Sequence, residues 1–178
     1  AETEPPPPYW AYAWAGGLVL AHYLRDRPEA VAGRRVLDLG TGSGLVAIVA
    51  AQAGAASVLA ADTDPFAVAA ARLNAKANGV ELTMTGEDLL GGPVPAVDIV
   101  LAGDVFYDEA VGARVLPFLD RCIAAGIDVL VGDPFRAPLP RARLIAIADY
   151  AVPDMGDSRG APGRASGVFR LLPAGGNV

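Results

Sequence analysis

Short, mostly apolar runs alternate with longer segments of helical spacing along the chain. Runs of the first kind occupy residues 36–39, 57–61, 81–85, 97–103 and 127–131, and each is followed directly by glycine or aspartate. Such runs are typical of parallel strands that are covered on both faces. Helical spacing is predicted over residues 18–24, 45–53, 65–77, 109–124 and 140–149. Two more strands are predicted over residues 150–153 and 166–172, joined by a polar loop at 154–165. The pattern predicts an α/β fold: a Rossmann-like, seven-stranded sheet, mostly parallel with a C-terminal antiparallel hairpin, and helices on both faces.

Two of the predicted helices carry specific signals. The helix over residues 65–77 is predicted to start with Asp64 as its cap and to end at Gly79. Its predicted apolar stripe consists of Phe66, Ala69, Ala70, Leu73 and Ala77. In the helix over residues 109–124, Pro117 predicts a kink or a break.

The run at residues 36–39 leads into three glycines at alternate positions, Gly40, Gly42 and Gly44. A strand, a glycine turn and a helix together open a nucleotide-binding βαβ unit. The spacing is G-x-G-x-G rather than the dinucleotide pattern G-x-G-x-x-G, and Asp38 precedes the first glycine by two residues. A carboxylate there would repel a pyrophosphate but would suit the ammonium group of an amino acid. An NAD-dependent oxidoreductase is therefore disfavoured.

Four acids stand at or after the ends of successive predicted strands: Asp38, Asp62, Asp88 and Asp104. In open α/β sheets the ligand lies outside the carboxyl ends of the strands, so these side chains should converge on one crevice. Asp62 lies about 20 residues past the glycines, where such folds place the acid that binds ribose hydroxyls. Asp88 is placed to accept from an adenine amino group, or it is simply a turn acid.

Composition limits the possible classes of protein. The chain has 178 residues, which predicts one domain, with residues 1–34 as an aromatic lead and helix and residues 35–178 as the core. A net charge of −6 argues against a nucleic-acid backbone as the partner. The single cysteine, Cys122, and the single histidine, His22, cannot form a disulfide framework or a Cys/His metal cluster, so no metal is expected. No apolar run is long enough for a membrane span and no signal peptide is visible, so we expect a cytoplasmic protein with no membrane partner.

Several motifs together resemble one family. The glycine segment Asp38-Leu-Gly-Thr-Gly-Ser-Gly44 resembles motif I of the class I S-adenosylmethionine (SAM) methyltransferases. Together with residues 7–14, 61–67, 101–108 (Leu-Ala-Gly-Asp-Val-Phe-Tyr-Asp) and 129–134, it resembles the seven-β-strand protein-lysine methyltransferases. The likeness is greatest to the branch that acts on the electron-transfer-flavoprotein β subunit and to its bacterial relatives. Position 15 is alanine where this branch leads us to expect proline, and residues 154–165 match no pattern of the family.

The resemblance implies SAM as cofactor and S-adenosyl-L-homocysteine as product. The residues expected to bind the cofactor are Trp14, Asp38, Gly40, Thr41, Gly42, Gly44, Asp62, Thr63, Asp88, Leu89 and Gly103. Asp104 and Tyr107 are expected beside the substrate amine, with a helix cap and a core tyrosine as the alternative interpretation. The aromatic segment from Tyr9 to Trp14 is either a flap that seals the core or a lid beside the cofactor, with Trp14 facing the adenine or the sulfonium.

The favoured function is methylation of lysine amines in a protein substrate, such as the electron-transfer-flavoprotein β subunit. A methyltransferase that acts on a ribosomal protein or a small molecule remains an alternative, as does a SAM-binding module without catalysis. Methyl transfer from a sulfonium needs little acid–base chemistry, but the lysine must arrive as a neutral amine. Because a nearby carboxylate favours the ammonium form, Asp104 is expected to hold and steer the amine rather than to deprotonate it.

Overall fold

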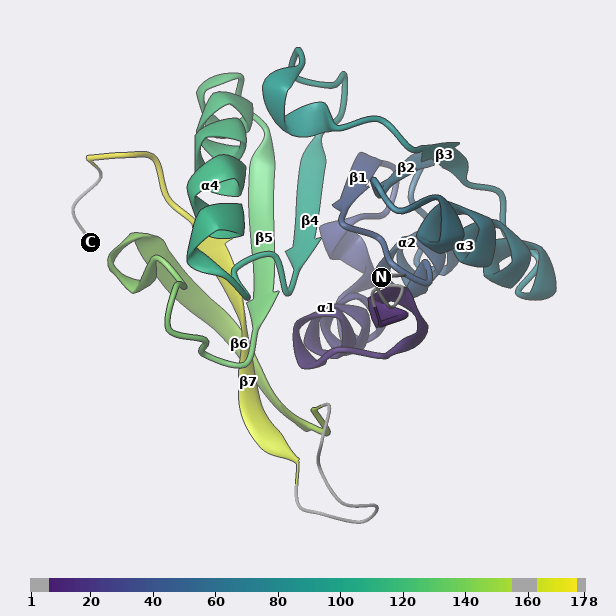
Figure 1. Ribbon diagram of the computed structural model, residues 1–178, viewed down its shortest axis with the longest axis horizontal. Coiled ribbons are helices and arrows are strands. Elements are labelled where there is room, and N and C mark those ends of the chain that lie inside the picture. Colours follow the sequence, from purple (N-terminus) through teal and green to yellow (C-terminus); the bar gives the residue numbers. More distant parts are fainter. Residues whose placement is uncertain (1–6, 155–162, 176–178) are drawn as a thin grey trace, which may run out of the picture.

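A computed structural model describes residues 7–154 and 163–175 of the chain. Its strands form one seven-stranded sheet in the order β3-β2-β1-β4-β5-β7-β6. They are β1 (Arg35–Leu39), β2 (Ser57–Ala61), β3 (Thr83–Thr85), β4 (Ile99–Gly103), β5 (Asp128–Asp133), β6 (Leu144–Val152) and β7 (Arg164–Leu171). The first five strands are parallel to one another, whereas β7 is antiparallel to both β5 and β6 (Figure 1). The predicted mostly parallel sheet with its antiparallel C-terminal hairpin is confirmed.

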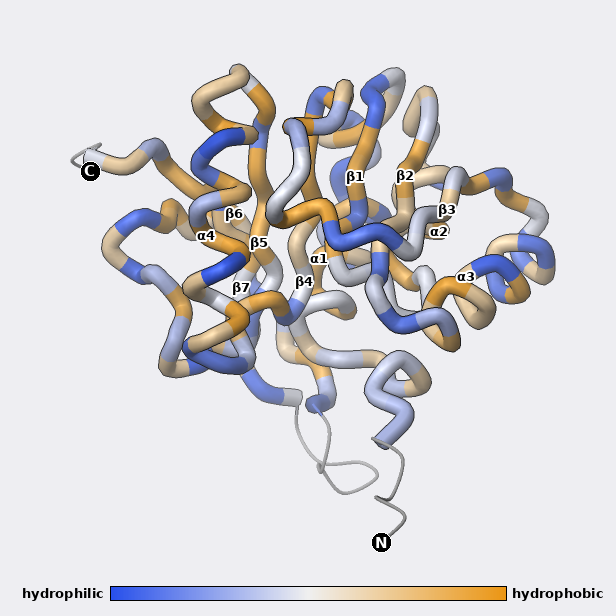
Figure 2. Tube along the Cα trace, turned by 45° about the horizontal axis from the view of Figure 1, so that its top comes forward, coloured by the Kyte–Doolittle hydropathy of each residue, from blue (hydrophilic) through white to orange (hydrophobic). Residues whose placement is uncertain are grey.

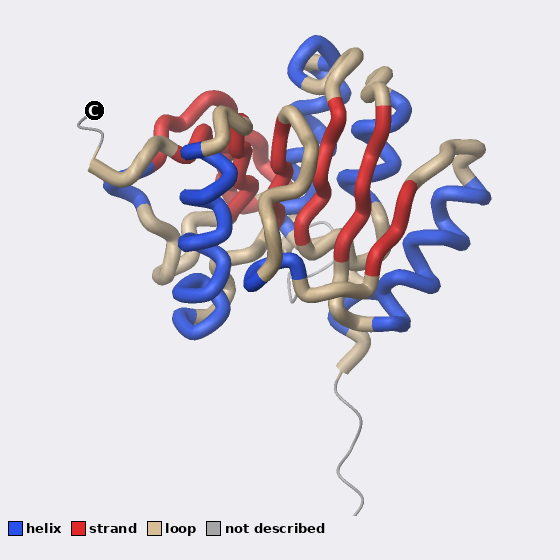
Figure 3. The backbone as a smooth tube through the Cα atoms, turned by 90° about the horizontal axis from the view of Figure 1, so that it is seen from above, coloured by secondary structure: helices blue, strands red, loops and turns tan. Residues whose placement is uncertain are grey.

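Helices lie on both sides of this sheet, as predicted (Figure 3). They are α1 (Ala15–Asp26), α2 (Leu45–Gln52), α3 (Pro65–Ala77) and α4 (Glu109–Ala124). Helices α1 and α2 share one core cluster with β1 and β4, and α4 contributes Phe118 and Leu119 to a second cluster. Strands β4 and β5 are mostly hydrophobic along their length, because both of their faces are covered (Figure 2). The sheet is thus held rigidly between two apolar layers.

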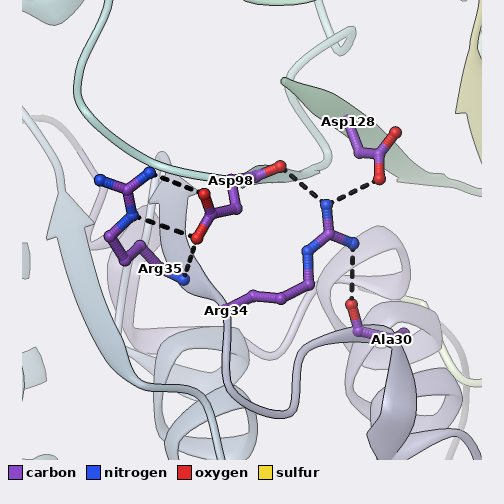
Figure 4. A network of polar contacts seen from close by, with 5 residues as sticks. All are labelled: Ala30, Arg34, Arg35, Asp98 and Asp128. Atoms are coloured by element: carbon purple, nitrogen blue, oxygen red, sulfur yellow. Dashed lines mark hydrogen bonds and ion pairs between the residues drawn. The ribbon is translucent and has the colours of Figure 1, made fainter. Parts of the chain in front are cut away.

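An ion-pair network fixes the amino ends of the central strands (Figure 4). Arg35, at the start of β1, pairs with Asp98 just before β4 at 2.7 Å, and Arg34 pairs with Asp128 at the start of β5, also at 2.7 Å. The Arg34 guanidinium also donates to the main-chain carbonyls of Ala30 and Asp98. The Arg35 guanidinium holds the pKa of the Asp98 carboxyl well below its usual range. These charges lie at the sheet edge opposite the carboxyl ends, so we assign them to the fold rather than to the site.

One predicted helix is wrong. Residues 140–149 form only a short 3-10 turn, Arg141–Arg143, followed by β6. The segment is alanine-rich, which favours a helix, but it pairs with β7 from Leu144 to Val152 with one irregularity between Ala146 and Ala148. Strand pairing over this length overrides local helix propensity.

The predicted stripe of α3 is also wrong. Phe66 and Leu73 are 70% and 69% exposed, and the buried face is formed by Ala67, Ala71 and Ala75. A Cβ built on Gly44 would lie 3.1 Å from the Cβ of Ala71, so the helix approaches the glycine loop too closely for large side chains. The contact selects small residues, and the large apolar residues face outward.

Three predictions about helix ends and breaks can be compared with the structure. The Asp64 side chain accepts from the main-chain N–H of Phe66 at 2.8 Å and caps α3, as predicted. Gly79 has a positive φ of 66° just past the end of that helix, which confirms it as the C-terminal glycine. Pro117 does not break α4, which runs from Glu109 to Ala124. The residue lies on the exposed side of the helix, where water can satisfy the carbonyl that loses its partner.

Candidate active site

A cleft of about 630 Å³ opens at the carboxyl ends of β1, β2 and β4. Nearly every residue that the sequence predicts for the site lines it, including the four acids Asp38, Asp62, Asp88 and Asp104. The exception is Gly44, which precedes α2 with φ +87° and faces α3 instead. The convergence expected from the ends of successive strands is therefore present, and Gly44 shapes the loop without lining the cleft.

The glycine loop is held from two sides. Gly40 and Gly42 have φ values of +73° and +53°, which only glycine adopts without strain. The Asp62 carboxylate accepts from the N–H of Gly42 at 2.8 Å and from the N–H of Asp64 at 3.0 Å. The carbonyl of Ala61 accepts from the N–H groups of Gly40 and Thr41 at 2.9 and 3.0 Å. Asp62 therefore braces the loop as well as facing the cleft.

Asp38 supports the same loop from below. Its side chain is buried and accepts from the Thr41 hydroxyl at 2.6 Å and from the Ala47 N–H of α2 at 3.0 Å. Burial raises the pKa of Asp38 to about 6, against the lowering effect of these two hydrogen bonds. The carboxylate thus joins strand, loop and helix and also forms part of the cleft wall.

Asp104 is placed by an unusually close approach of α1 to the sheet. The residue follows β4 with φ +57°, a left-handed conformation that is uncommon outside glycine. Its carboxylate accepts from the N–H of Gly17 in the first turn of α1 at 2.7 Å. A Cβ on Gly16 would lie 2.2 Å from the Gly132 carbonyl oxygen, so glycine is needed for α1 to reach this carboxylate. Asp104 therefore caps α1 from 87 residues away, whereas α4 is capped by Asp108.

Sequence reasoning missed Arg136, which forms an ion pair with Asp104. Arg136 lies in the loop after β5 and is one of the residues that line the cleft. Extending the strand-end rule to the fifth strand would have included the segment from Asp133 to Arg136. Burial raises the pKa of the Asp104 carboxyl, and the Arg136 guanidinium and the N–H groups of Gly16 and Gly17 oppose that rise.

Asp88 takes part in two local contacts. It caps the 3-10 turn Leu89–Gly91 by accepting from the Leu90 N–H at 3.1 Å, and it forms an ion pair with Arg114 of α4. The Leu90 N–H, followed by Arg114, lowers the pKa of the Asp88 carboxyl. The turn interpretation is thus correct as far as it goes, and the adenine role stays a prediction.

The aromatic segment lines the cleft instead of the core. Tyr9, Tyr12 and Trp14 all line it, and none of them is buried. The Trp14 indole N–H donates to the Tyr9 carbonyl at 2.8 Å, and the Trp14 ring lies about 6 Å from both tyrosine rings, at 6.1 and 6.0 Å. Tyr107 is 63% exposed at the same cleft, so it is not a core tyrosine. These positions favour the lid interpretation over the sealing flap.

Residues of the described ranges give neither a metal site nor a membrane helix. Among them, no group of three or more His, Cys, Asp or Glu side chains is arranged to hold a metal ion. None of the helices described is both long and apolar enough to cross a membrane.

Sequence comparisons find two groups of methyltransferases. The family model described as ribosomal protein L11 methyltransferase (PrmA) matches residues 24–103. The electron transfer flavoprotein beta subunit lysine methyltransferase of Danio rerio is 41% identical over 155 residues, covering 84% of this chain and 60% of the relative. The Xenopus laevis protein of the same name is 42% identical over 154 residues, covering 83% and 62%. A ribosomal protein L11 methyltransferase of Symbiobacterium thermophilum is 60% identical over 100 residues, covering 53% and 33%. The chain thus spans about three-fifths of the length of these two lysine methyltransferases.

Solved structures support the same fold. TrmN from Thermus thermophilus aligns with a TM-score of 0.63 and 28% identity, covering 87% of this chain and 48% of that one. The N-methyltransferase NodS from Bradyrhizobium japonicum, solved in complex with S-adenosyl-L-homocysteine, aligns with a TM-score of 0.61 over 86% of both chains. At 16% identity, this likeness shows only that the two chains share a fold.

Proposed function

We propose that the chain is a class I S-adenosylmethionine-dependent methyltransferase and that it transfers methyl groups from SAM to lysine amines of a protein. The observation that carries the proposal is the cleft at the strand ends, where the glycine loop, Asp62 and Asp104 all meet. The residues of this cleft also form the segments that resemble lysine methyltransferases.

The cleft fits SAM in size and in the order of its groups. Its volume of about 630 Å³ lies within the usual range for small-molecule sites. The bare backbone of Gly40 and Gly42, with Asp38 beneath it, suits the amino-acid end of SAM, because a Cβ at either glycine would be strained by the positive φ. Gly103 and Trp14 would lie near the sulfonium end of the cofactor.

The nucleoside end would lie against Asp62, Thr63, Asp88 and Leu89. A carboxylate has about four acceptor positions, and the N–H groups of Gly42 and Asp64 take two of those on Asp62. Two positions remain for the ribose hydroxyls. The loop can therefore stay braced while the ribose binds.

The acceptor amine would lie beside Asp104 and Tyr107. The N–H groups of Gly16 and Gly17 and the Arg136 guanidinium occupy three of the acceptor positions on Asp104, which leaves about one for an amine N–H. The exposed ring of Tyr107 would form the wall of the lysine channel. Bound SAM supplies the electrophilic methyl group, and the protein contributes alignment of the amine with it, which is worth about 7–11 kcal/mol in favourable cases.

We propose the electron-transfer-flavoprotein β subunit as the protein substrate and a ribosomal protein as the second candidate. The Danio rerio lysine methyltransferase matches 84% of this chain, whereas the Symbiobacterium protein matches 53% of it, which favours the first. The net charge of −6 gives no support to a nucleic-acid substrate. We further propose that residues 1–178 act as one methyltransferase domain, with 1–34 as its lead, since α1 shares a core cluster with β1 and β4. A single cysteine also requires no oxidising compartment, which supports a cytoplasmic place of action.

The test is transfer of label from methyl-labelled SAM to purified electron-transfer-flavoprotein β subunit, ribosomal protein L11 and a desalted bacterial extract. We expect a labelled protein band, mapped to lysine by mass spectrometry. Asp104→Asn should remove the band and retain SAM affinity in calorimetry, whereas the exposed control Asp149→Asn should behave as wild type. SAM binding without labelled protein would instead indicate a small-molecule acceptor or a binding module.

A further inference from the structure

Arg136 occupies a position that the proposed chemistry does not yet explain. Its guanidinium Nη1 pairs with Asp104 and lies 3.8 Å from Oδ2 of Asp133, while Nη2 lies 3.7 Å from Oδ1 of Asp154. The side chain is only 19% exposed. One guanidinium therefore lies among three carboxylates at the acceptor side of the cleft.

The local backbone fixes this arrangement. The Arg136 N–H donates to Oδ1 of Asp133 at 2.6 Å, and Asp133 is completely buried. Its other oxygen accepts no hydrogen bond in the described part of the chain, and burial raises the pKa of Asp133 to about 6. Phe135 adopts φ +64° and packs edge-on against Phe169, with ring centroids 5.4 Å apart. The loop therefore presents the guanidinium to Asp104 in one orientation.

The charges around Asp104 are almost all negative. Asp133, the last residue of β5, and Arg136, in the loop that follows, face Asp104, and Asp154 lies behind Arg136 after β6. From α1, Asp104 contacts main-chain N–H groups rather than charged side chains. Tyr107 follows Asp104 in the loop after β4.

Farther along the cleft wall lie Asp38, Asp62, Asp64, Glu87 and Asp88. Among the described residues that line the cleft, the cations are Arg114, which pairs with Asp88, and Arg136. Arg136 is therefore the positive charge that acts at the acceptor position.

We propose, on the basis of the function proposed above, that Arg136 is a positioning residue that makes the acceptor lysine react as a neutral amine. By staying paired with Asp104, the guanidinium prevents this carboxylate from trapping the lysine as a tightly bound ammonium. The ammonium then loses its proton to solvent, and Asp104 accepts a hydrogen bond from the remaining amine. The nitrogen lone pair forms the new N–C bond while the S–C bond breaks with its electrons kept on sulfur, and the surplus proton on the product leaves to solvent.

Removal of this positive charge has a distinctive expected effect. In Arg136→Gln, an unpaired Asp104 would bind the ammonium more tightly, so KM for the protein substrate should fall while kcat at pH 7 also falls. An opposite charge at this distance shifts a pKa by about 1–3 units, so the pKa of the bound lysine should rise by this amount. The acid limb of the pH profile of kcat should then move to higher pH by about one to three units. The activity of the variant relative to wild type should therefore rise between pH 7 and pH 10, which a merely structural defect would not produce.

The experiment measures kcat and KM of the full chain from pH 6 to pH 10 with electron-transfer-flavoprotein β subunit and methyl-labelled SAM. Arg136→Lys keeps the charge and should retain an acid limb close to wild type. Asp154→Asn removes a carboxylate behind the guanidinium and should move the limb in the opposite direction, to lower pH. It serves as the second variant if Arg136→Gln does not fold.

A second readout needs no turnover. In carbon-13 NMR titrations of the free protein, the pKa of Asp104 should rise further in Arg136→Gln than in Arg136→Lys, because the guanidinium opposes its rise in the wild type. A uniform loss of activity at every pH, with an unmoved acid limb, would overturn the inference and leave the proposed function intact. A wild-type chain that methylates no lysine would overturn both.

Discussion

Two adjacent glycines in the first turn of α1 provide a matched test of how the acceptor side is built. A Cβ on Gly16 would lie 2.2 Å from the Gly132 carbonyl oxygen and 2.6 Å from Oδ2 of Asp104. A Cβ on Gly17 would meet nothing closer than 3.8 Å, the distance to a methyl carbon of Val46. Gly16→Ala and Gly17→Ala therefore make the same chemical change in the same helix with opposite steric consequences.

The expected free energies follow from these distances. Replacing a helical glycine by alanine stabilises a protein by about 0.5–1 kcal/mol when the site is open. Overpacking a tight contact costs about 1–3 kcal/mol, and the Gly132 carbonyl is main chain of a central strand that cannot move aside cheaply. We therefore expect Gly17→Ala to be neutral or to stabilise by up to about 1 kcal/mol. Gly16→Ala should destabilise by a net value of about 2 kcal/mol.

Urea unfolding followed by circular dichroism measures both values, with equal slopes as the check that the unfolded states match. In a domain of this size, about 2 kcal/mol corresponds to a loss of about 4–8 °C in Tm. The Gly16 variant should also weaken methyl transfer, because it separates α1 from the Asp104 carboxylate. Equal stabilities of the two variants would refute the close approach of α1 to β5.

Three further predictions concern the cleft and its surroundings. Asp62→Ala should lower SAM affinity at least about tenfold in calorimetry, because it removes the brace on the glycine loop and would also remove the two charge-assisted hydrogen bonds proposed for the ribose. An unchanged Kd would contradict the assignment. The folded-state pKa of Asp38 is raised to about 6 from an ordinary value of 3.8, so its ionisation costs stability as pH rises between these values. Compared with Asp38→Asn, the wild type should therefore lose about 3 kcal/mol between pH 3 and pH 7, and a flat difference would contradict the burial effect. Phe66→Ser and Leu73→Ser should each change unfolding free energy by only about 0.5 kcal/mol, and a loss above about 2 kcal/mol would show that α3 buries this stripe after all.

The central strands and the glycine loop could be predicted because their sequence signals are determined locally. A strand covered on both faces must be apolar throughout, as β4 is from Ile99 to Gly103, and a left-handed turn requires glycine. The convergence of the acids followed from topology alone, since parallel strands place their carboxyl ends along one edge. These inferences needed no knowledge of side-chain packing.

The missed features depend on contacts between distant segments. Residues 144–149 of β6 are predicted as a helix, because the pairing of β6 with β7, from Leu144 opposite Leu171, is invisible in local propensity; only the end of β6 falls in the predicted strand 150–153. The buried face of α3 was misassigned because closeness to Gly44 selects small rather than hydrophobic side chains. The position of Arg136 after the fifth strand marks it as a possible cleft residue, but its pairing with Asp104, 32 positions earlier in the chain, is invisible in the sequence.

The two acids most directly predicted to bind ligands each accept a hydrogen bond from a glycine N–H. Asp62 holds the N–H of Gly42, and Asp104 holds the N–H of Gly17, so each carboxylate fixes a backbone segment that forms the wall of the cleft. A residue in this position cannot be replaced without changing both the ligand contact and the shape of the site. Asparagine retains one carbonyl acceptor and alanine retains none. Loss of activity or binding in both variants would show that the negative charge is needed. Loss in the alanine variant alone would show that the hydrogen bond to the backbone N–H is needed. The comparison of these two substitutions at each acid therefore separates binding from architecture where the structure has joined them.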